Sequence, residues 1–211
     1  MSNESRSRGI RIVRDGDSTH VLDVHCGHCA ACQVALDYWC LDARHDGELL
    51  FSLDTPASPE ELRHWLGGLA ALSTARSAPD AVLMVLEDVD QRAAADLVRP
   101  WHAGPVLSSV DGRDDEARAR LAELSPTGRA QVVLTLQAAR TAVRSVERGG
   151  QVCLPDVPVD GPSVAELVQR DVRLLAPRRI EDLVARTSWA ELAGPLERVL
   201  DTNASPVGAG Q

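Results

Sequence analysis

Residues 25–40 read HCGHCAACQVALDYWC, and this stretch holds four of the five cysteines and two of the six histidines of the chain. Its cysteines follow the spacing C-x2-C-x2-C-x7-C. The residues before it, 10–24, contain two β-branched runs, IRIV and HVLDV, on either side of the turn sequence DGDS. This pattern predicts a β-hairpin whose second strand leads directly into Cys26.

The pattern after Cys29 becomes helical. Apolar side chains fall on one stripe, and other apolar residues follow on the opposite side, so we expect a largely buried helix over about residues 29–41. In a continuous helix that rises 1.5 Å per residue, Cys40 would lie about 16 Å from Cys29 along the axis. That distance is too long for both to bind one ion, which predicts that Cys40 is a core residue and not a ligand.

Three cysteines at strict x2 spacing with interleaved histidines indicate a metal site. Zinc prefers a tetrahedral shell of thiolates and imidazoles. We therefore expect Cys26, Cys29 and Cys32 to bind one zinc ion. The fourth ligand would be a histidine, drawn from His25, His28, His20 and His45.

An iron–sulfur cluster is the second metal candidate, because C-x2-C-x2-C also begins the cluster-binding run of bacterial ferredoxins. That run continues x3-C-P, whereas position 36 here is Leu and the chain contains no Cys-Pro. Zinc is therefore favoured over the cluster. A further alternative is that the cysteines bind nothing and pack as small apolar residues, which is our expectation for Cys40 and Cys153.

The tetrapeptide Cys26-Gly27-His28-Cys29, placed between a strand and a helix, resembles the active-site dithiol of thioredoxin-like oxidoreductases, in particular the protein disulfide isomerases. The resemblance covers about 20 residues. It implies that Cys26 is the nucleophile, Cys29 the resolving thiol and His28 a group that tunes the pair. It also implies a cis-proline beside the dithiol, for which Pro155 and Pro158 are the nearest candidates.

Composition excludes several functions. All 22 basic residues are arginine, so a P-loop lysine, a Schiff-base lysine and a lysine general base are ruled out. The net charge of -9 makes nucleic acid an improbable partner. No apolar run reaches 18 residues, so we expect no membrane span, and the N-terminus lacks the apolar stretch of a signal peptide. A cytoplasmic location follows as an expectation.

The remaining sequence predicts an α+β fold. We expect a small N-terminal unit over residues 1–73 that carries the cysteines, a mostly helical region over 81–202 with a buried strand, and a disordered tail over 203–211. The main elements are a strand at 48–53, a helix opened by Ser58, a buried strand at 81–86, helices over 90–98 and 114–124, a short strand in 105–110, a long helix over 125–149, at most an edge strand within 151–162, and three short helices to the end.

These patterns together favour a cytosolic metal-binding protein. In this hypothesis a structural zinc stabilises the N-terminal unit, which acts as an interaction module for a protein partner. The alternative is a thiol–disulfide oxidoreductase that uses Cys26 and Cys29, so the sequence leaves open whether the protein is an enzyme.

Overall fold

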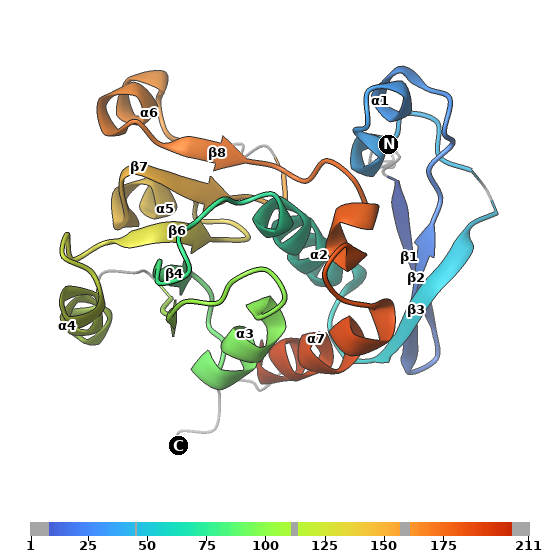
Figure 1. The fold of residues 1–211 in the computed structure, drawn as a ribbon. Coiled ribbons are helices and arrows are strands. Elements are labelled where there is room, and N and C mark those ends of the chain that lie inside the picture. The colour runs from blue at the N-terminus through green and yellow to red at the C-terminus, as the bar shows by residue number, and fades with distance from the viewer. Residues whose placement is uncertain (1–8, 45, 111–113, 157–160, 204–211) are drawn as a thin grey trace.

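Two β-sheets of different kinds form the framework of the protein (Figure 1). The computed structural model describes residues 9–203 with the exception of 45, 111–113 and 157–160. The first sheet is antiparallel, in the order β1-β2-β3, with β1 at Ile10–Asp15, β2 at Ser18–Asp23 and β3 at Glu48–Asp54. The predicted hairpin and the strand at 48–53 are thus confirmed.

The second sheet has five strands, all parallel, in the order β5-β4-β6-β7-β8. Helices alternate with these strands along the chain, as parallel pairing requires a crossover connection. The strands are β4 (Leu83–Val85), β5 (Val106–Ser108), β6 (Ala130–Leu134), β7 (Val146–Cys153) and β8 (Arg173–Leu175). The intervening helices are α3 (Gln91–Val98), α4 (Asp115–Leu124), α5 (Ala139–Ser145) and α6 (Val164–Arg170).

The continuous apolar run at 81–86 is explained by the two faces of this sheet. Leu83 and Val85 belong to the hydrophobic cluster on one face, whereas Val82, Met84 and Leu86 belong to the cluster on the other. All five are at most 2% exposed. A strand covered on both sides needs apolar residues at every position, so the predicted buried strand is confirmed as β4.

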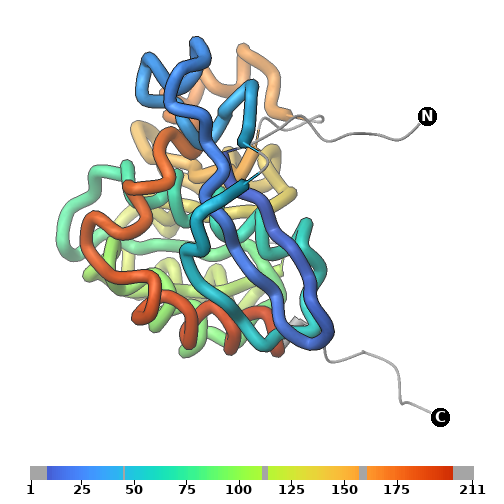
Figure 2. The backbone as a smooth tube through the Cα atoms, turned by 90° about the vertical axis from the view of Figure 1, so that its right-hand side faces the viewer, coloured from blue at the N-terminus to red at the C-terminus, as the bar shows by residue number. Residues whose placement is uncertain are grey.

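Helices α2 (Pro59–Ser73) and α7 (Trp189–Asn203) lie between the two sheets (Figure 1). Ser58 caps α2 as predicted, since its hydroxyl accepts from the Glu61 N–H at 3.1 Å. The fully buried Trp65 belongs to a cluster that also contains residues of β1, β3, β4, β6 and α7. The proposed units 1–73 and 81–202 therefore share one hydrophobic core. Figure 2 shows the three antiparallel strands lying across one side of the molecule.

The α+β class is confirmed, but the region after residue 81 holds more strand than the expected single buried one. The long helix predicted over 125–149 was wrong, because this segment forms β6, α5 and the start of β7. Gly149 and Gly150 do not end a helix. A Cβ on Gly150 would lie 2.5 Å from Val146 Cγ2 and 2.8 Å from the Gln131 carbonyl oxygen, so β7 needs glycine there to approach β6.

The prediction of at most an edge strand within 151–162 was also wrong, because residues 151–153 form an interior strand segment paired with both β6 and β8. Its prolines begin only at Pro155, after the strand has ended. Strand β8, three residues long, was missed. Residues 204–211 of the predicted tail lie outside the described residues. Within the described part, no helix is long and apolar enough to cross a membrane.

Candidate metal centre

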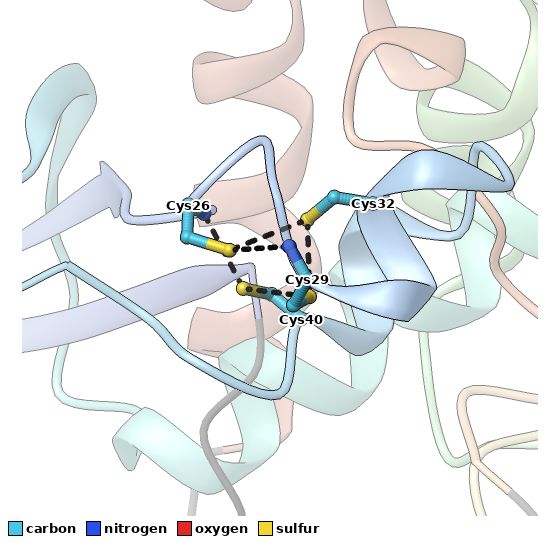
Figure 3. Close-up of side chains that lie close together, drawn as sticks. All are labelled: Cys26, Cys29, Cys32 and Cys40. Carbon is cyan, nitrogen blue, oxygen red and sulfur yellow. Dashed lines mark hydrogen bonds between the residues drawn. The ribbon is translucent and has the colours of Figure 1, made fainter.

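Four cysteine thiols converge beside the end of the first sheet (Figure 3). The Sγ atoms of Cys26, Cys29, Cys32 and Cys40 all lie within 4.8 Å of one another. The separations are 3.9 Å for Cys26–Cys32, 3.6 Å for Cys29–Cys32 and 3.9 Å for Cys29–Cys40. All four are free thiols in the structure.

Cys40 joins this cluster because the predicted helix over 29–41 does not exist. Helix α1 covers only Ala30–Gln33, and Ala35 adopts a left-handed conformation with φ 57°. The N–H of Ala35 donates to the Cys32 carbonyl at 3.1 Å and that of Leu36 to the Ala31 carbonyl at 2.9 Å. This pair of bonds is a Schellman motif, which ends a helix and turns the chain. The 16 Å separation inferred from a continuous helix was therefore wrong.

A short 3-10 helix, η1 (Asp37–Trp39), carries Cys40 back toward the other thiols and fixes it to the body of the protein. Tyr38 is fully buried, and its hydroxyl donates to the Arg63 carbonyl of α2 at 3.3 Å. The Trp39 indole N–H donates to the Pro177 carbonyl at 2.6 Å. Cys40 is buried, as predicted, but its sulfur faces the cluster.

Backbone N–H groups point at the sulfur atoms. The N–H groups of His28 and Cys29 lie 3.5 and 3.2 Å from Cys26 Sγ, and that of Leu41 lies 3.4 Å from Cys29 Sγ. Hydrogen bonds from Leu41 and Cys32 N–H groups lower the pKa of Cys29 to about 6. Desolvation acts to raise the pKa of Cys26, but the two backbone hydrogen bonds outweigh it and the pKa is lowered. These donors stabilise thiolates, the form that binds metals.

The other two thiols have the opposite tendency. Burial raises the pKa of Cys32 to about 12 and also raises the pKa of Cys40. Without a metal ion, the cluster therefore combines one pair of thiols that ionises readily with another that stays protonated. A divalent cation would displace these protons, because a coordinating thiol is deprotonated by the charge of the ion.

The histidines lie around the cluster in different settings. His25 Nδ1 is 2.5 Å from Asp23 Oδ1. His28 is exposed, with Nδ1 2.9 Å from the Cys26 carbonyl and Nε2 3.2 Å from Asp42 Oδ2, and it forms a second possible metal group with Cys26 and Asp42. His20 Nδ1 is 2.8 Å from Ser52 Oγ in the antiparallel sheet. His45 lies outside the described residues.

The four sulfurs have the spacing of a tetrahedral metal shell. With Zn–S bonds of about 2.3 Å, the edge of a regular tetrahedron is about 3.8 Å. The three sulfur separations quoted above, 3.6, 3.9 and 3.9 Å, lie close to that value. The cluster can therefore hold a metal ion with four thiolate ligands, and the expectation that Cys40 lies too far from the other cysteines to be one of them was wrong. The spacing C-x2-C-x2-C-x7-C includes Cys40 as a fourth cysteine. The assumption of a continuous helix placed it too far from Cys29 to bind the same ion.

The cis-proline implied by the resemblance to thioredoxin-like oxidoreductases is not found among the described residues. Every described peptide bond is trans, including the one before Pro155, and Pro158 lies outside the described residues. Cys26 and Cys29 do lie in one cluster, with Cys29 the N-cap residue of α1.

Glu87 is a second chemically distinctive residue, at the carboxyl end of β4. Strand β4 pairs with β5 on one side and with β6 on the other, so the strand order changes direction at this point. Glu87 Oε1 accepts from the Leu136 N–H at 2.6 Å and lies 3.5 Å from Thr135 Oγ1, both just after β6. Open parallel sheets commonly bind ligands at the carboxyl ends of the strands where the strand order changes direction. Here the Glu87 carboxylate connects the end of β4 to the residues that follow β6. No role for Glu87 was predicted from the sequence.

Replacing Glu87 by glutamine should remove a pH dependence of stability. Burial raises the pKa of Glu87 from its ordinary value of 4.5 to about 7. The folded state then holds a proton that the unfolded state has lost, so stability falls as pH rises from 4.5 to 7 and is flat above. Because the side chain is partly exposed, we expect about 1 kcal/mol from this group. Denaturant unfolding of E87Q at pH 5 and 8 should show a smaller difference than wild type; an equal difference would exclude Glu87 as its source.

Comparison with known proteins finds no matching family model and no matching curated protein. Among solved structures, 2R,3R-butanediol dehydrogenase from Bacillus subtilis has 15% identity and a TM-score of 0.45, with 90% of this chain and 65% of that chain covered. Acetophenone reductase from Geotrichum candidum, solved with NAD, has 14% identity and a TM-score of 0.47 over 88% of this chain and 70% of that chain.

The alcohol dehydrogenase of Aeropyrum pernix has 16% identity and a TM-score of 0.48 over 84% of this chain and 66% of that chain. This chain therefore spans less than two thirds of the Bacillus and Aeropyrum proteins. At these identities and TM-scores, the activities of those enzymes do not transfer to this chain.

Proposed function

We propose that the protein binds one zinc ion through Cys26, Cys29, Cys32 and Cys40, and that the ion has a structural role. The observation that carries this proposal is the convergence of four sulfurs at separations close to the edge of a Zn–S4 tetrahedron. Four thiolates leave no open coordination position, which is the arrangement of structural and not catalytic zinc.

The local structure explains what the ion would stabilise. Helix α1 has four residues and none of them is buried, and Val34 and Leu41 on either side of the turn are 60% and 65% exposed. In the segment from Cys26 to Cys40, hydrophobic burial is therefore confined to the end, where Tyr38 packs in the core, and it contributes little between Cys26 and Leu36. A zinc ion bound to both ends of this segment and to α1 would supply the missing free energy, because binding to the folded form alone is coupled to folding.

The test is metal analysis of protein purified without added zinc, combined with thiol titration. We expect near-stoichiometric zinc and no reactive thiol in the folded protein, with four thiols becoming reactive when a chelator removes the metal and the buried Cys153 only on unfolding. Cobalt substitution should give the intense visible bands of a tetrahedral thiolate site. Metal-free protein that binds neither ion when reduced would contradict the proposal.

Thiol redox chemistry at Cys26 and Cys29 is the second proposal. It is favoured by the lowered pKa of both thiols, about 6 at Cys29, because backbone hydrogen bonds stabilise the thiolates. Disulfide formation in a glutathione buffer and its reversal by dithiothreitol, followed by mass spectrometry, would support it. Zinc that protects the pair from oxidation would instead support the structural role. The expected protein partner and the cytoplasmic location remain predictions.

A further inference from the structure

Four arginines line one cavity on the side of the molecule away from the cysteines. The cavity has a volume of about 300 Å³, and Arg118, Arg129, Arg144 and Arg170 contribute to its wall. They come from α4, the residue before β6, α5 and the end of α6, which places the cavity near the amino ends of β6 and β7. No carboxylate is among the described residues that line it.

A concentration of positive charge at one place is unexpected in a chain with a net charge of -9. Two of the four arginines have acidic neighbours. Arg144 Nη2 is 3.0 Å from Glu166 Oε1, and Arg118 Nη1 is 3.8 Å from the exposed Asp115. Within the described part of the chain, Arg129 and Arg170 have no ion pair. The positive charge at the cavity is therefore only partly compensated.

Arg129 and Arg170 also have a structural role, and it leaves most of their donors unused. Arg129 Nη1 donates to the carbonyl of Arg144, and Arg170 Nη1 is 3.4 Å from the Val143 carbonyl and 3.3 Å from that of Arg144. These carbonyls end α5, where cations are favoured. Each guanidinium has five N–H donors in a planar fork, and among the described residues only Nη1 of each donates a hydrogen bond. Two arginines are thus held in place with free donors.

We propose that this cavity binds the phosphate group of a small phosphorylated molecule. Guanidinium groups bind phosphate oxygens in a bidentate way. Several guanidinium groups complement the double negative charge of a phosphate better than the single charge of a carboxylate ligand. The volume is at the lower end for ligand cavities, which fits a phosphate and a short organic group. This proposal uses none of the cysteines and is independent of the zinc site.

The experiment is calorimetric titration of the full chain with inorganic phosphate and, separately, with glycerol 2-phosphate, at constant ionic strength adjusted with sodium chloride. We expect saturable binding at one site per chain. Tighter binding of glycerol 2-phosphate would identify a phosphate ester as the ligand class, and equal or tighter binding of inorganic phosphate would identify the free anion and overturn the organic part of the proposal.

Variants locate the site. Arg118→Gln should weaken binding by roughly tenfold or more, the effect of losing a hydrogen bond from a charged donor. Arg118 is exposed on α4 and pairs only weakly, so this variant should fold. Arg129→Gln should have a similar effect if its unfolding temperature is retained. Arg92→Gln, an exposed arginine of α3, is the control and should bind as wild type. Absence of saturable binding, or R118Q affinity equal to that of wild type, would overturn the proposal.

Discussion

Cys40→Ser should abolish stoichiometric zinc binding and loosen the segment from Cys26 to Cys40. Serine keeps the size of the side chain but replaces a soft thiolate by a hydroxyl that stays protonated and binds zinc poorly. Loss of one of four ligands should weaken zinc binding by roughly a thousandfold or more, a part of the total of about 10 to 16 kcal/mol for structural sites. The zinc content of this variant therefore distinguishes a site of four thiolates from a site of three thiolates and a histidine.

Cys153→Ser is the matched control. Cys153 is also fully buried, in β7, but it does not belong to the sulfur cluster. Both variants bury a serine hydroxyl, which costs about 1 to 3 kcal/mol when unpaired. Only Cys40→Ser should change the zinc content and the rate at which a chelator removes the ion. Stoichiometric zinc in C40S, together with loss of zinc in a His25 or His28 variant, would show that the fourth ligand is a histidine and not Cys40.

The sequence predicts the position of the candidate metal site well and its geometry poorly. The hairpin before Cys26 and the helix start at Ser58 were predictable because turn residues and capping boxes act within four residues. The turn at Ala35 was not, because a Schellman motif with alanine in the left-handed position has no local marker comparable to glycine. The apolar residues on all sides of the expected helix were the available warning. Of these residues, Tyr38 and Trp39 pack against the body of the protein, where they donate to the Arg63 and Pro177 carbonyls, whereas Val34 and Leu41 are exposed.

The parallel sheet shows a second kind of limit. Strand β4 was predictable because both its faces are covered and every residue is apolar. In contrast, Val132, Leu136, Ala139 and Val143 recur every three or four residues by coincidence across a strand, a loop and a helix. The arginine cavity could not be predicted at all, since its four members are spread over 53 positions and meet only through the tertiary fold.

Gly67→Ala should destabilise the protein although alanine is the better helix former. Gly67 lies in the middle of α2, and a Cβ there would be 2.6 Å from Tyr38 Oη and 2.9 Å from the Pro155 carbonyl oxygen. Overpacking against a buried tyrosine and the backbone costs up to about 3 kcal/mol. The gain in helix propensity is about 1 kcal/mol, so the net loss should be about 2 kcal/mol.

Its neighbour provides the control. A Cβ on Gly68 would meet Leu134 Cδ1 at 2.9 Å and Leu136 Cδ2 at 3.3 Å, the flexible ends of two side chains, so Gly68→Ala should cost less in the same denaturant titration. Gly67→Ala should also weaken zinc binding, because it displaces Tyr38, two residues from Cys40. A loss of stability with unchanged zinc affinity would show that η1 can shift without moving Cys40. A stabilised G67A would mean that α2 approaches neither Tyr38 nor the Pro155 backbone closely, since these contacts oppose the gain in helix propensity.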